Sequence, residues 1–181
     1  MSSQFEQIYK NIAKEEGQDN MHAAPRLDRV VVNVGVGKHR DNKSHIEAVQ
    51  KDLEKITGQH PHARVARKAI AGFNVRAGNL VGYRVTLRGK RMEDFTRRFV
   101  GVTLPRVRDF RGLSIKSMDG KGNLSVGLKE QLSFPEIHAD KTDVIFGVQV
   151  TFVTTTNDNE SGVRLFRGLG FPMADKADSG D

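Results

Sequence analysis

The chain has 181 residues, of which 37% are hydrophobic, and its formal net charge is +7. This length and composition suit one domain with an ordinary core rather than a two-domain enzyme, and the absence of Cys excludes disulfides, thiolate nucleophiles and Cys-based zinc sites. The N-terminal residues lack the apolar stretch of a secretory signal and no run of about 18 apolar residues occurs, so we expect a cytoplasmic protein without a membrane partner.

Helices and strands alternate in the first part of the chain. Apolar residues at helical spacing, from Phe5 to Ile12, predict an amphipathic helix that ends near Gly17. Residues 27–34 then alternate as a β-strand. We expect one face of this strand in the core (Asp28, Val30, Val32 and Val34) and the other face free (Leu27, Arg29, Val31 and Asn33). A second helix follows, which Ser44 would cap and Gly58 would end.

The remaining elements are mostly strands. Two are predicted over residues 63–70 and 80–88, joined by a Gly-rich basic loop, and in the second the polar residues Arg84, Thr86 and Arg88 share one face. A third helix would bury Met92, Phe95, Phe99 and Val102 before the Leu104-Pro105 pair interrupts it. The chain would end with strands over residues 124–129 and 143–154 and a short helix over residues 160–169.

This order predicts an α+β fold, a mainly antiparallel sheet with helices packed on one face. The other face would be free and would carry Arg29, Asn33, Arg84, Thr86 and Arg88. Forked donors, an amide and a hydroxyl can contact phosphates and the 2′-hydroxyls of RNA, so we interpret this face as RNA-binding, the alternative being an ordinary solvated face. We expect one domain over residues 1–173 and a disordered acidic tail over residues 174–181.

Positive charge is concentrated in the middle of the chain. Between Arg64 and Arg111 there are 13 Lys or Arg and three acidic residues, a net charge of +10, so the rest of the chain sums to −3. Clustered positive charge indicates a phosphate-bearing partner, because each neutralised phosphate releases condensed counterions. The alternatives are a solvated basic surface or attraction to an anionic membrane. Arg outnumbers Lys here, which favours forked recognition of phosphate.

Motifs for enzymatic chemistry are incomplete. The Gly35-Val36-Gly37 turn has Arg40 where a dinucleotide-binding loop needs its third glycine, and no phosphate-binding loop of the G-x-x-x-x-G-K-[ST] type occurs. The His residues are scattered, and the close pair His60 and His62 has no partner typical of a metal site. We therefore expect neither an enzyme nor a bound cofactor or metal.

Six sequence blocks, in order over nearly the whole chain, resemble the bacterial ribosomal protein L5 family of the large subunit. They are PRLDRVVVNVGVG (25–37), ITGQHP (56–61), ARKAIAGFNVRAGNLVGYRVTLRG (66–89), RVRDFRGLS (106–114), GNLSVGLKEQLSFPEI (122–137) and LFRGLGFPM (165–173). The resemblance implies a structural ribosomal protein that binds 5S rRNA, helps attach it to 23S rRNA in the central protuberance, contacts the peptidyl-site tRNA and bridges to small-subunit protein S13.

The resemblance also implies which residues make these contacts. By motif, the 5S rRNA contact falls on Asn33, Gln59 and Thr86, and we add the basic residues of the free face, Arg29, Arg84 and Arg88. The tRNA-contacting loop maps to about residues 68–80, with Lys68, Gly72, Arg76 and Gly78 as its basic and flexible positions, and the intersubunit bridge maps to the region after Arg106, with Arg108 and Arg111.

Two alternatives remain open at this point. The chain could be an RNA binder of similar fold that acts off the ribosome, which co-sedimentation with large subunits would exclude. It could also be a nucleotide-dependent enzyme that uses the GVGKHR turn at residues 35–40, in which case ATP, GTP or NAD would shift its melting temperature.

Overall fold

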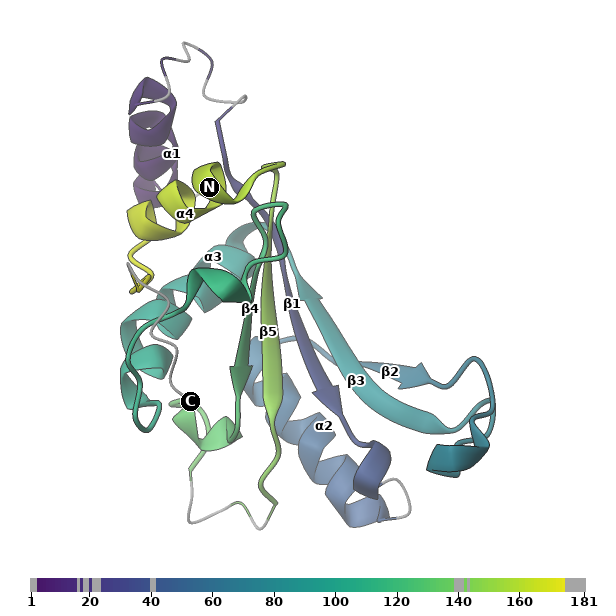
Figure 1. Ribbon diagram of the computed structural model, residues 1–181. Coiled ribbons are helices and arrows are strands. Elements are labelled where there is room, and N and C mark those ends of the chain that lie inside the picture. The colour runs from purple at the N-terminus through teal and green to yellow at the C-terminus, as the bar shows by residue number, and fades with distance from the viewer. Residues whose placement is uncertain are drawn as a thin grey trace.

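The computed structural model describes residues 3–15, 17, 20, 24–39, 42–138, 142 and 144–174 (Figure 1). Most of the tail predicted over residues 174–181 lies outside these residues. Ala174 is described, and its backbone N–H donates to the carbonyl of Leu113 at 2.9 Å.

One five-stranded sheet forms the centre of the molecule. All strand pairs are antiparallel, in the spatial order β2-β3-β1-β5-β4, so the first strand in the chain lies in the middle. The strands are β1 (Leu27–Gly35), β2 (His62–Val65), β3 (Leu80–Leu87), β4 (Leu124–Leu128) and β5 (Val148–Thr154).

The helices cover one face of this sheet. They are α1 (Ser3–Glu15), α2 (Lys43–Thr57), α3 (Gly89–Arg98) and α4 (Asn159–Gly168), and in Figure 1 α1, α3 and α4 lie to one side of the strands while α2 runs behind them. Their apolar residues and the inward residues of the strands form a single buried cluster. The predicted α+β fold with helices on one face of an antiparallel sheet is confirmed.

The core is organised around Phe152 of β5, which is fully buried. Its ring centroid lies 4.9 Å from that of Phe171, 5.3 Å from Phe99 and 6.3 Å from Phe166. These rings come from the segment after α3, from α4 and from the residues that follow α4. Edge-to-face and tilted aromatic contacts stabilise the fold beyond the free energy gained by burial. The contacts of Phe152 therefore stabilise the packing of the helical layer against the sheet.

A β-bulge at the start of β1 corrects the predicted assignment of faces there. The pairing of β1 with β5 shifts register between Leu27 and Arg29. Leu27 is therefore buried although it was predicted on the free face, and Asp28, predicted in the core, is half-exposed beside Arg29. From Val30 to Val34 the predicted alternation holds.

Four other predictions were wrong in detail. The N-cap of α2 is Asn42, whose side chain accepts from the backbone N–H of His45 at 3.1 Å, and not Ser44. The strands predicted over residues 63–70 and 143–154 are shorter, because β2 ends at Val65 and β5 begins at Val148. Val102 is 41% exposed and not buried, since residues 99–103 form a π-helical turn whose wider spacing rotates it away from the core.

Replacing Phe152 with Ala should lower the free energy of unfolding by about 3–5 kcal/mol, because it leaves a cavity between three aromatic rings and the sheet. Urea unfolding followed by circular dichroism measures this. Val153→Ala is the matched control, since Val153 is half-exposed on the opposite face of the same strand and should cost less than about 1 kcal/mol. Equal losses in the two variants would contradict the proposed role of the ring cluster.

Candidate nucleic-acid interface

The face of the sheet that the helices leave uncovered is lined by polar residues in cross-strand rows. In the register of the four strand pairs, one row runs from β2 to β4 through His62, Arg84, Asn33, Gln149 and Gly127. Directly opposite residues of an antiparallel pair share a face, so these side chains stand side by side. We call this surface the free face. Asn33 and Gln149 are exposed, and Arg84 is half-buried.

A second row lies one step further along the strands. It contains Thr86, Val31, Thr151 and Ser125. The hydroxyl groups of Ser125 and Thr151 are 3.1 Å apart and form a hydrogen bond. The free face thus presents imidazole, guanidinium, amide and hydroxyl groups across the five strands.

The structure extends the predicted site toward β2, β4 and β5. The prediction used only β1 and β3, and the structure places Asn33, Arg84 and Thr86 together there as expected. The sequence reasoning missed His62, Ser125, Gln149 and Thr151. The alternation of residues 148–152 carried the signal, because Gln149 and Thr151 occupy the positions between the core residues of β5.

Asp28 forms ion pairs with two of the predicted arginines. Its carboxylate lies 2.6 Å from Nη1 of Arg29 and 3.0 Å from Nη1 of Arg88. All three side chains are more than a third exposed, so these ion pairs add little to stability. The ion pairs do orient both guanidinium groups at the edge of the free face. Because Asp28 carries a negative charge, the net positive charge at this edge is lower than the number of arginines suggests.

Arg84 differs from these two arginines. It lies between His62 and Asn33, and its Nε is buried without a hydrogen-bond partner among the described residues. A buried donor that lacks an acceptor is unfavourable, because it has lost water without replacing the hydrogen bond. The Nε of Arg84 is therefore an unsatisfied donor beneath the free face, next to the exposed Asn33.

Gln59 lies apart from the rows, on the connection between α2 and β2. The helix ends at Gly58, whose left-handed backbone (φ 64°) turns the chain. Thr57 fixes the turn, because its hydroxyl donates to the carbonyl oxygens of Leu53 at 2.7 Å and Gln59 at 3.0 Å. Gln59 is half-buried and precedes His62 by three residues, at the edge of the sheet.

Beyond the sheet, β2 and β3 continue as a hairpin that projects from the body of the molecule (Figure 1). At its base, the backbone N–H of Ala66 donates to the carbonyl of Asn79 and the N–H of Gly78 donates to the carbonyl of Ala66, and at its tip Ile70 and Val75 exchange two hydrogen bonds. The predicted loop residues Lys68, Gly72, Arg76 and Gly78 are all exposed along this hairpin. The sequence reasoning missed its apolar tip, where Phe73 is 75% and Ile70 51% exposed.

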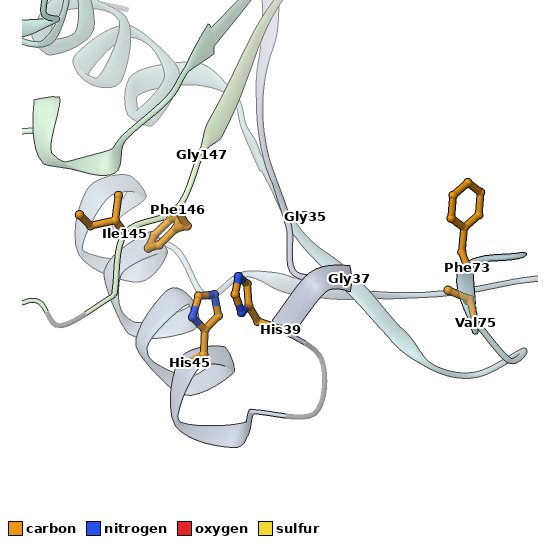
Figure 2. A pocket seen from close by; sticks show the side chains of 9 residues that line it. All are labelled: Gly35, Gly37, His39, His45, Phe73, Val75, Ile145, Phe146 and Gly147. Carbon is orange, nitrogen blue, oxygen red and sulfur yellow. The ribbon is translucent and has the colours of Figure 1, made fainter.

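A concave corner separates the hairpin from the body. Its volume is about 640 Å³. Figure 2 shows Phe73 and Val75 on the hairpin side, with His39, His45 and Phe146 on the opposite side. The rings of His39 and His45 stack with centroids 4.3 Å apart. Burial lowers the pKa of His45, and the nearby His39 lowers it further.

The predicted bridge residues lie on another part of the surface. Arg108 and Arg111 are exposed on the segment that follows α3. The end of this segment is anchored to the C-terminal residues, because the backbone N–H of Leu113 donates to the carbonyl of Pro172 at 2.8 Å.

Neither a membrane span nor a metal cluster is found in the described part of the chain. None of its helices has the length and apolar character needed to cross a bilayer. Within the same residues, His, Asp and Glu form no group of three or more that could hold a metal ion.

Comparison with known proteins decides the family. A family model described as ribosomal protein L5 matches residues 20–76, and a second model, which describes the C-terminus of the same ribosomal family, matches residues 80–173. The chain belongs to the ribosomal protein L5 family. This confirms the resemblance seen in the sequence blocks.

Individual relatives cover most of the chain. Large ribosomal subunit protein uL5 of Carboxydothermus hydrogenoformans is 49% identical over 158 residues, 87% of this chain and 88% of the relative. The corresponding protein of Heliobacterium modesticaldum is 51% identical over 157 residues, 87% of each chain. That of Colwellia psychrerythraea is 43% identical over 169 residues, 93% of each chain.

The two L5 family matches meet at the hairpin and divide the free face between them. The N-terminal match contains β1 and β2, and the C-terminal match contains β3, β4 and β5. The cross-strand row of the free face is therefore built from both matched parts.

The lowered pKa of His45 predicts a dependence of stability on pH. The folded state binds a proton at His45 less readily than the unfolded chain does, so stability from this group is present above the unfolded pKa, about 6.5, and is lost as pH falls through it. The loss in the free energy of unfolding between pH 7.5 and pH 5.5 should be smaller in His45→Gln than in the unaltered protein. His138→Gln, at an exposed position, serves as the control, and an equal loss in all three proteins would contradict the prediction.

Proposed function

We propose that this protein is a structural, non-catalytic component of the large ribosomal subunit and that its free face binds 5S rRNA. The observation that carries the proposal is the row of polar side chains on β2, β3, β1 and β5, with Asn33 and Arg84 directly opposite each other within it. Membership of the L5 family and the names of the relatives, which are large ribosomal subunit proteins, support the ribosomal assignment.

The chemistry of the free face suits a folded RNA. Double-stranded RNA presents 2′-hydroxyls and base edges in a wide, shallow minor groove, and a broad surface of amides and hydroxyls can reach them. Asn33, Gln149 and Thr86 can donate to and accept from such groups, while Arg84 brings an unsatisfied donor to the interface. The flanking Arg29 and Arg88 are held by Asp28 and can contact phosphates at the rim.

Other surfaces fit the remaining contacts that we propose. The protein would help attach 5S rRNA to 23S rRNA in the central protuberance. The projecting hairpin, with exposed Lys68 and Arg76, would reach the peptidyl-site tRNA, and the segment with Arg108 and Arg111 would bridge to small-subunit protein S13. These contacts are separate in space from the free face, so each can be removed without the others.

Replacing Asn33, Gln59 or Thr86 with Ala should each weaken 5S rRNA binding by about 1–3 kcal/mol, because an RNA group that lost water on binding would lose its partner. Filter binding at fixed salt measures the affinity. Gln7→Ala is the control, since Gln7 is exposed on α1, on the helical side of the sheet. Unchanged affinity in all three variants would remove the proposed site.

Replacing both Lys68 and Arg76 with Ala should leave 5S rRNA binding and subunit assembly intact but speed the dissociation of tRNA from the peptidyl site. The physical reason is that the hairpin contact is electrostatic and distant from the free face. Dissociation of labelled tRNA from mutant and unaltered ribosomes measures the effect.

Lys10→Ala with Lys14→Ala removes the same charge from α1 and is the control for that experiment. Equal dissociation rates in all three kinds of ribosome would refute the role of the hairpin. Loss of 5S rRNA binding in the Lys68 and Arg76 variant would instead show that the hairpin contacts 5S rRNA.

A further inference from the structure

The turn that joins α2 to β2 carries Gln59, a proposed RNA contact that lies outside the strands of the sheet. Helix α2 ends at Thr57, and Gly58 and Gln59 lead the chain toward β2, which begins at His62. Connections of this kind are usually more mobile than the elements that they join. The groups that hold this turn therefore decide whether Gln59 is ordered before an RNA is bound.

The hydroxyl of Thr57 holds the backbone of Gln59 at two points. Thr57 is only 4% exposed. Its hydroxyl accepts from the backbone N–H of Gln59 at 3.3 Å and donates to the carbonyl of Gln59 at 3.0 Å. The same hydroxyl donates to the carbonyl of Leu53 at 2.7 Å. Because a hydroxyl has a single proton, the carbonyls of Leu53 and Gln59 share it.

The two residues do not depend equally on this hydroxyl. Leu53 lies within α2, where α-helical geometry supplies its carbonyl with the backbone N–H of Thr57, four residues later. For Gln59, the described part of the chain offers its backbone N–H and carbonyl no hydrogen bond besides the two with Thr57. Removal of the hydroxyl would therefore affect Gln59 more than the helix.

Other groups hold the end of α2 itself. The backbone N–H of Gly58 donates to the carbonyl of Glu54 at 2.8 Å. From α3, Nη2 of Arg98 donates to the carbonyl of Ile56 at 3.4 Å. The last carbonyls of a helix have no partner within it, so these two bonds satisfy acceptors that the helix leaves open. Loss of the hydroxyl would thus release Gln59 and leave the end of the helix in place.

Helix α3 contains a matching threonine without such a turn. Thr96 is 1% exposed, and its hydroxyl donates at 2.8 Å to the carbonyl of Met92, four residues earlier. Thr57 makes the same kind of bond to Leu53 and adds the two bonds to Gln59. A comparison of the two threonines therefore separates the effect of a buried helical hydroxyl on stability from its effect on Gln59.

We propose that Thr57 is a positioning residue for RNA recognition, which holds Gln59 ready for its RNA contact and does not touch the RNA itself. This inference rests on the proposed function, in which Gln59 contacts 5S rRNA. A group that is ordered before binding loses less conformational entropy when it binds. The buried hydroxyl of Thr57 therefore contributes to affinity from inside the protein.

The test is a double-mutant cycle, measured as binding of labelled 5S rRNA to the full-length protein. Thr57→Val replaces the hydroxyl with a methyl group and should weaken binding about fivefold, because Gln59 must then be ordered on binding. In the Gln59→Ala background the same change should alter the affinity by less than about twofold, since no contact is left to position. In the Asn33→Ala background it should still weaken binding about fivefold, because that contact is independent of the turn.

Two variants serve as controls. Thr57→Ser keeps the hydroxyl and should bind within about twofold of the unaltered protein. Thr96→Val loses the equivalent buried hydrogen bond in α3 and should also bind within about twofold. Thr57→Ala removes the hydroxyl with a smaller side chain and should repeat the result of Thr57→Val, and melting temperatures verify that each variant is folded.

Several outcomes would overturn the inference. They are unchanged affinity in Thr57→Val and Thr57→Ala, equal weakening in Thr57→Ser or Thr96→Val, an undiminished loss in the Gln59→Ala background, a reduced loss in the Asn33→Ala background, and unchanged affinity in Gln59→Ala alone. Failure of the proposed function is distinguishable, since it would show as an absence of 5S rRNA binding by the unaltered protein.

Discussion

The separation of apolar and polar residues onto the two faces of one sheet is the constraint on which the rest of the structure depends. Alternation along the strands buries Val32, Val85 and Phe152 under the helices, and the same alternation turns Asn33 and Arg84 outward. Because the period of a strand is two residues, a slip of one residue in pairing would exchange the faces. The register that closes the core is thus also the register that builds the candidate interface.

Acidic residues orient several of the arginine side chains on the surface of this protein. Asp28 orients Arg29 and Arg88 at the rim of the free face, and Glu136 orients Arg98 on the helical side. Such partly exposed pairs add little to folding stability. The ion pairs do restrict the orientation of the arginine guanidinium groups on both sides of the sheet.

Periodic segments could be predicted from the sequence, and local departures from periodicity could not. Alternation and helical spacing identified the fold and the central part of the free face. The β-bulge beside Asp28 and the π-helical turn that contains Val102 each shift the pattern by one residue, and their cause lies in tertiary pairing rather than in local composition. Gln149 and Thr151 could be assigned to the free face only once the pairing of β5 with β1 was known, and the position of Gln59 in the candidate site follows from family resemblance alone.

The hairpin has a mechanical consequence, because it is continuous with the strand that carries the centre of the free face. Its base, at Ala66 and Asn79, leads directly into β3, on which Arg84 and Thr86 stand. Because the hairpin and β3 form one continuous segment, a displacement of the hairpin tip would be transmitted along β3 toward the free face (Figure 1). An RNA bound to the free face would restrict this movement, so a partner that contacts the hairpin tip would meet a more rigid hairpin.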